Sequence, residues 1–206
     1  MKYFIPLESN KYYHIFNHAV GSEDFFKCED NYKYFLKKFI EYINPIAKIY
    51  AYVLMPNHFH FLIEIKDKKE IYKRYFNLEL KKEFPKIKLE NEIDYEKFVM
   101  QQFSNIFNSY TKSFNKKYNR KGALFIDYLR RIEICHEEYQ RNLTIYIHQN
   151  PINHKFCDSI NKWKFSSYNS ILSEKLTLIE RQEVLNWFGG VENFIFLHQT
   201  PTNIIY

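Results

Sequence analysis

Two histidines with one residue between them, His58 and His60, are the residues whose type and spacing most clearly suggest chemistry. They lie in the segment MPNHFHFLIEI, residues 55–65. Side chains alternate across a strand, so both imidazoles belong to one face, about 6–7 Å apart at the backbone. We expect this face to be the open face of the sheet, where the two rings share one divalent metal ion. A strand with two histidines on a hydrated face is the alternative interpretation, and it fits most H-x-H sequences.

A metal held by two neutral imidazoles still lacks a nucleophile. Tyrosine is abundant, with 18 copies, so composition does not choose among them. A tyrosine on a helix beside a metal should have a polar partner one turn away, because residues i and i+4 share a face. Tyr146 has Asn150 at that position, whereas Tyr110 has Phe114 on an apolar stripe and is assigned to the core. An aromatic side chain on a half-buried helix is the competing interpretation of Tyr146.

Hydrophobic periodicity and turn residues predict the elements that position these side chains. In chain order we expect a strand over 12–17, a helix over 30–43, a hairpin of strands 47–54 and 58–65, a long helix over about 98–114, a strand over about 123–134, and a helix over 137–149 that ends where Asn150 meets Pro151. Strands and helices do not alternate strictly, which argues against a parallel doubly wound sheet. The order predicts an α+β fold, a ferredoxin-like antiparallel sheet with helices packed on it.

Two more histidines, His14 and His18, lie in the first predicted strand region. Their separation of four residues does not bring them close together on one strand face. We therefore interpret them as incidental residues or as DNA contacts.

Length and composition favour one domain. With 206 residues, 46% of them hydrophobic, the chain is long enough for one core. We expect a single domain over 1–206, with its main part at about 10–170, a charged insertion at about 67–97 and a helical tail at about 171–206. Three scattered cysteines and the lack of a long apolar run indicate a soluble protein of a reducing cytoplasm with no membrane span.

The charge balance is mildly basic. Lys and Arg outnumber Asp and Glu by 30 to 24, for a formal net charge of +6, which is compatible with a nucleic-acid partner. The basic residues expected to contact DNA phosphates are Lys116, Lys117, Arg120, Lys121, Arg130 and Arg131. Solvated surface charges without a partner are the alternative for any one of them.

The segment YIHQNP at 146–151, together with the PNHFH strand, resembles the REP-associated tyrosine transposases. These are relatives of the insertion-sequence-200-like, single-tyrosine HUH transposases. Supporting segments are YHIFN at 13–17, NRKGALF at 119–125 and WKFSSY at 163–168, so the resemblance spans about residues 10–170. The sequence departs from the family at HAVG, residues 18–21, where an Arg-Gly segment is usual, and in the length of its charged insertion.

The resemblance implies an HUH endonuclease fold and metal-dependent cleavage and rejoining of single-stranded DNA through a 5′-phosphotyrosine. It implies that His58 and His60 bind the metal, that Asn150 is the third ligand and that Tyr146 is the nucleophile. It also implies Mg²⁺ or Mn²⁺ as cofactor, although imidazole ligands suit Mn²⁺ better than Mg²⁺. The expected partner is single-stranded DNA with a hairpin or repeat end, in the bacterial nucleoid, with a homodimer as one option. A non-catalytic nucleic-acid-binding module and a domesticated, host-serving relative are the alternatives.

Overall fold

Four strands form one antiparallel sheet in the computed structural model, which describes residues 5–77, 92–126 and 129–199. The strands are β1 (Tyr12–His18), β2 (Ala47–Met55), β3 (His58–Ile65) and β4 (Arg130–Ile134), and their order across the sheet is β2-β3-β1-β4. Each neighbouring pair is antiparallel. This is the ferredoxin-like arrangement, so the predicted fold class is confirmed.

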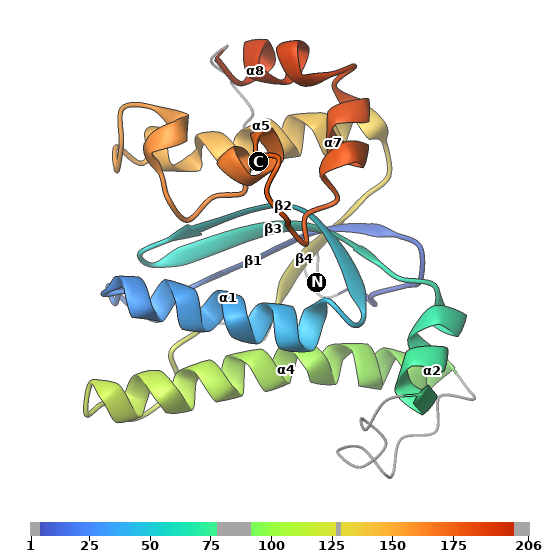
Figure 1. The fold of residues 1–206 in the computed structure, drawn as a ribbon. Coiled ribbons are helices and arrows are strands. Elements are labelled where there is room, and N and C mark those ends of the chain that lie inside the picture. Colours follow the sequence, from blue (N-terminus) through green and yellow to red (C-terminus); the bar gives the residue numbers. More distant parts are fainter. Residues whose placement is uncertain (1–4, 78–91, 127–128, 200–206) are drawn as a thin grey trace.

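The phenylalanine face of β3 packs against two long helices, as the alternation of residues predicts. Helices α1 (Glu29–Ile43) and α4 (Glu92–Lys117) lie side by side under this face (Figure 1). Phe59 and Phe61 are buried in the aromatic core between them and the sheet. The ring of Phe39 in α1 stacks on that of Phe61, with ring centres 3.8 Å apart. This layer fixes which face of β3 carries the histidines.

The histidine face is not open, contrary to our expectation. Helix α5 (Glu137–Asn153) and the C-terminal elements form a layer above it (Figure 1). Those elements are the 3₁₀ turn η1 (Ile160–Lys162) and the helices α6 (Tyr168–Leu172), α7 (Arg181–Trp187) and α8 (Val191–Gln199). Leu62 packs with Leu143 and Ile147 of α5 in a second hydrophobic cluster. All eight residues of β3 are therefore buried.

Helix α5 continues through Pro151 to Asn153, so the predicted end at Asn150 is wrong. Proline lacks an N–H group and removes one backbone hydrogen bond, but the next turn is still made. The backbone N–H of His154 donates to the Asn150 carbonyl at 3.0 Å. Asn150 consequently lies inside the helix, one turn before its end, and keeps the same face as Tyr146.

Two other predicted boundaries change. Strand β4 begins at Arg130, not near Ala123; residues 123–126 instead run beside the end of β1, where the Ile126 N–H donates to the His18 carbonyl at 3.0 Å. In the expected charged insertion, α2 (Lys68–Asn77) begins after Asp67, whose carboxylate accepts from the Lys69 N–H. Residues 78–91 of that insertion lie outside the described part of the chain, and the division into core, insertion and tail stays a prediction.

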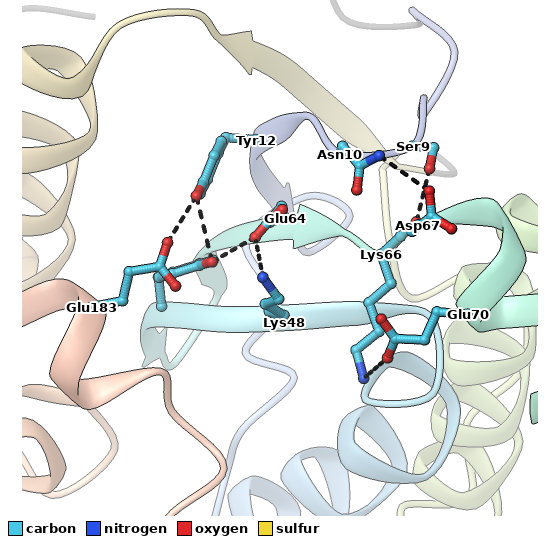
Figure 2. A network of polar contacts seen from close by, with 10 residues as sticks. Ser9, Asn10, Tyr12, Lys48, Glu64, Lys66, Asp67, Glu70 and Glu183 are labelled. Atoms are coloured by element: carbon cyan, nitrogen blue, oxygen red, sulfur yellow. Dashed lines mark hydrogen bonds and ion pairs between the residues drawn. The ribbon is translucent and has the colours of Figure 1, made fainter.

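A polar network occupies the end of β3 far from the histidines (Figure 2). Glu64 accepts hydrogen bonds from the Tyr50 hydroxyl at 2.5 Å and from the Lys48 ammonium at 3.0 Å. Tyr12 donates to Glu183 of α7 at 3.0 Å, which ties the C-terminal layer to the sheet. Glu64 shares the histidine face but is already paired there. Among the described residues, no helix combines the length and apolar character needed to cross a membrane.

Candidate active site

Helix α5 brings three side chains over the histidine end of β3. Tyr146, Asn150 and the C-cap residue His154 are spaced by four residues, so they lie along one line on the helix and its C-terminal end. The Asn150 Oδ1 atom lies 3.2 Å from Nε2 of His58. The Tyr146 ring centre lies 5.4 Å from that of His60, and the His58 and His60 ring centres are 5.3 Å apart. The proposed nucleophile and all three proposed metal ligands therefore meet within one chain.

The His58 ring lies between two side-chain oxygens. Its Nδ1 is 2.8 Å from the Asn57 Oδ1 atom, and its Nε2 faces Asn150. Burial lowers the pKa of His58 to about 4, so the imidazole is neutral near pH 7 and carries a single N–H group. If that N–H donates to Asn57, a nitrogen lone pair and the Asn150 oxygen face each other. The Asn150 amide group donates to the Tyr146 carbonyl at 3.4 Å, which is consistent with this orientation.

With His58 in the tautomer that donates to Asn57, its Nε2 atom and the Asn150 oxygen are two acceptors that would fit a divalent cation. Two ligand atoms in adjacent positions, each about 2.1–2.2 Å from one metal, are about 3 Å apart. The observed distance between His58 Nε2 and Asn150 Oδ1 is 3.2 Å. His60 is also buried, which lowers its pKa well below 6.5, with a smaller contribution from His14. Both histidines are thus held in the neutral form that ligates metals.

The third ligand would be an amide and not a carboxylate. In the described parts of the chain, no group of three His, Cys, Asp or Glu side chains is arranged to hold a metal ion. Glu64, the one carboxylate on the histidine face of β3, is engaged by Tyr50 and Lys48. A cation at His58, His60 and Asn150 would need oxygen atoms from water or phosphate to complete its coordination. Mg²⁺ or Mn²⁺ remains a prediction.

Three further histidines surround this site. The sequence interpretation treated His14 and His18 as incidental residues or DNA contacts, and it did not single out His154. His14 and His18 of β1 lie on the same sheet face, because the register places His18 opposite His58 and His14 opposite Leu62. The His18 ring stacks on His58 with ring centres 4.9 Å apart, and His154 approaches His58 at 4.8 Å. The i, i+4, i+8 spacing of Tyr146, Asn150 and His154 was a usable signal, but only for a helix that continues through Pro151.

The comparisons with known proteins give one structural match. No family model and no curated protein matches the sequence. A solved structure of a REP-associated tyrosine transposase bound to a REP hairpin is similar, with a TM-score of 0.55 and 13% sequence identity. The match covers 86% of this chain and 88% of that one. The two proteins share a fold. At this identity the likeness concerns the fold alone.

The predicted DNA-contacting residues fall into two groups. Lys116, Lys117 and Lys121 are exposed at the end of α4 and in the loop after it, although Lys117 also approaches Asp30 at 3.6 Å. Arg130 is half-buried and pairs with Phe16 across β1 and β4, so it lies on the histidine face. These positions leave phosphate contacts as a prediction for all four residues.

Arg120 and Arg131 are engaged in internal hydrogen bonds, and their contact with DNA stays a prediction. The Arg120 guanidinium donates to Glu23, to Asn115 and to the carbonyls of Gly122 and Ala123. Arg131 is buried on the opposite sheet face, where it donates to the carbonyls of Ile5 and Leu129. The odd-even alternation of β4 separates Arg131 from Arg130. Sequence charge alone does not reveal these internal acceptors.

Proposed function

We propose that this chain is a metal-dependent single-stranded DNA endonuclease and strand transferase that works through a 5′-phosphotyrosine intermediate. The observation that carries the proposal is the meeting of Tyr146 with His58, His60 and Asn150 in one chain, at the distances given above. The shared fold with a transposase whose solved structure contains a REP hairpin supports a nucleic-acid partner. The substrate we propose is single-stranded DNA with a hairpin or repeat end.

In the first step, the Tyr146 hydroxyl oxygen attacks a DNA phosphorus. A bond forms between these two atoms, and the bond from phosphorus to the deoxyribose 3′-oxygen breaks. The phenolic proton ends on the departing 3′-oxygen. The products are a 5′-phosphotyrosine and a free 3′-hydroxyl.

In the second step, a 3′-hydroxyl attacks the phosphorus of the phosphotyrosine. A new phosphodiester forms, the bond to Tyr146 breaks, and the proton of the attacking hydroxyl returns to the tyrosine. One phosphodiester is exchanged for another through the covalent intermediate, so rejoining needs no ATP. The choice of attacking 3′-hydroxyl decides between resealing and strand transfer.

The residues of the chain prepare the site for this chemistry. A phenol with an ordinary pKa of about 10 is a weak nucleophile at neutral pH. A divalent cation bound to His58, His60 and Asn150 would supply positive charge beside the phenol oxygen and the phosphate. Burial keeps the two imidazoles neutral, and α5 holds Tyr146 against His60.

The test is nicking of end-labelled single-stranded oligonucleotides that contain inverted repeats, in the presence of Mn²⁺. We expect a product with a free 3′-hydroxyl and a protein whose mass has increased by the 5′ fragment. Tyr146→Phe should lower nicking at least about 1,000-fold, because the attacking oxygen is missing. DNA binding and thermal stability should stay at the wild-type level.

Tyr110→Phe is the matched control. Tyr110 lies in the core on the opposite sheet face, where its hydroxyl donates to the Phe25 carbonyl. This variant should lose some stability but retain nicking. Normal nicking by Tyr146→Phe would contradict the proposal. Tight DNA binding without any nicking by the wild-type protein would instead support the non-catalytic binding module.

A further inference from the structure

One buried histidine beside the candidate metal site has no part in the mechanism described above. His14 lies on β1, and its side chain is only 3% exposed. Its Nε2 atom is 2.9 Å from Nδ1 of His60. The ring centres are 5.1 Å apart and the ring planes differ by 26°, so the two nitrogens face each other nearly in the ring planes. This is the geometry of an in-plane hydrogen bond.

The position of His14 is set by the sheet. Across the β1–β3 pair, His14 lies opposite Leu62 and Phe16 lies opposite His60, so His14 and His60 are diagonal neighbours on one face. Phe16 packs beside both rings, with ring centres 4.8 Å from His14 and 5.9 Å from His60. The strand on either side of β1 and this aromatic packing hold the His14 ring where it meets His60.

The hydrogen bond has two possible directions, and they have opposite consequences. Both rings are buried, and two adjacent positive charges would repel, so the two imidazoles share one proton across the contact. If His14 donates, the proton of His60 lies on Nε2, and that nitrogen is unable to bind a metal. If His60 donates from Nδ1, its Nε2 carries the lone pair. Only the second arrangement agrees with His60 as a ligand.

We propose that His14 is a positioning residue that holds His60 in the Nδ1–H tautomer, with Nε2 ready to bind the divalent cation. This inference rests on the proposed function, since it assigns a partner to one of its ligands. His14 accepts through Nε2 and carries its own proton on Nδ1. It orients His60 as Asn57 orients His58, so each candidate ligand has a hydrogen-bond acceptor behind it.

The first test compares two substitutions of similar size and shape, His14→Gln and His14→Met. Glutamine keeps an acceptor oxygen, whereas methionine offers only a weakly accepting sulfur. Mn²⁺ titrations followed by electron paramagnetic resonance should give a 10–100-fold lower affinity for His14→Met, about the loss typical of such partners. His14→Gln should stay close to the wild-type affinity. Equal affinity of His14→Met and wild type, or equal loss in both variants, would overturn the role of His14.

The second test uses the metal-free wild-type protein and needs no variant to fold. Long-range ¹H–¹⁵N spectra distinguish the two neutral tautomers of each histidine. We expect His60 to carry its proton on Nδ1, and a proton on Nε2 would overturn the proposal. Wild-type protein that fails to bind Mn²⁺ even in the presence of single-stranded DNA would contradict the proposed function itself. The tautomer of His60 would still decide whether His14 acts on it as we infer.

Discussion

At the scale of single residues, the charge of the three candidate ligands sets what a bound cation would offer to DNA. His58, His60 and Asn150 are all neutral ligands, because burial keeps the two imidazoles in their uncharged form. A divalent cation on such ligands keeps its full positive charge for the phosphate oxygens. Affinity for divalent cations rises with the number of charged ligands, so binding without DNA should be weak. The chain thus favours cation binding together with a phosphate.

Substitution of Asn150 tests how the charge of the ligands sets the affinity for the cation. Asn150→Asp should raise the Mn²⁺ affinity of the DNA-free protein about 10-fold, because a carboxylate adds a charged oxygen ligand. Asn150→Ala should lower it at least about 10-fold. Mn²⁺ titration followed by electron paramagnetic resonance measures both changes. Asn153→Asp, an exposed position on the same helix, is the control and should bind as the wild type does. Equal affinities of the wild type, Asn150→Asp and Asn150→Ala would rule out this side chain as a ligand.

At the scale of elements, the sequence predicts best what depends on neighbouring residues. The alternation of Phe59, His60 and Phe61 separates a core face from a histidine face, because successive strand residues point to opposite sides. The structure has this separation, with the phenylalanine face against α1 and α4. The hairpin around Pro56 and Asn57 follows from the same local pattern.

What the sequence does not predict depends on contacts between distant segments. Because β1 pairs with β3 in the sheet, His14 and His18 lie at the site. The spacing of residues along the chain does not reveal this strand order. The docking of α5 onto the sheet buries a face that we expected to be open. Pro151 ended the helix in our prediction because a proline disfavours the helical conformation of the residue before it, yet the helix continues to Asn153.

The loop between α4 and β4 gives a prediction at this scale. Arg120→Ala should lower the free energy of unfolding by about 2–3 kcal/mol, because charge-assisted bonds to Glu23 and to two loop carbonyls are lost. Lys121→Ala, at the exposed neighbouring position, should change stability by less than about 0.5 kcal/mol. Urea unfolding measures both.

Measurements of single-stranded DNA binding should distinguish the roles of Arg120 and Lys121. Lys121→Ala should reduce the slope of log affinity against log salt concentration by about the amount that corresponds to one phosphate contact. A stable Arg120→Ala protein with reduced salt dependence would place Arg120 on the DNA-binding surface and remove its structural role.

At the scale of the whole molecule, the C-terminal layer holds the helix that carries Tyr146. His148 of α5 lies between the Ser167 hydroxyl at 2.7 Å and His198 of α8 at 2.9 Å, and all three residues are buried. His198 in turn donates from Nδ1 to the Phe194 carbonyl at 2.7 Å. The Ser167 hydroxyl also accepts from the Tyr52 N–H of β2 at 2.9 Å, so this chain of hydrogen bonds fixes α5 between α8 and the edge of the sheet. Tyr146 is therefore presented to the histidines of its own chain.

This arrangement predicts that one chain contains a complete site. Tyr146→Phe lacks the attacking oxygen and His60→Ala lacks a ligand, so each variant should be inactive by itself. If Tyr146 acts on the site of its own chain, as the 5.4 Å approach to His60 indicates, a mixture of the two variants should also be inactive. A tyrosine that acts in a partner's site would give mixed dimers with one intact site, and nicking would return to about a quarter to a half of the wild-type rate, by the statistics of pairing in a two-fold dimer. Nicking assays after co-expression of differently tagged variants distinguish the two outcomes, and recovered activity would contradict a site built from one chain.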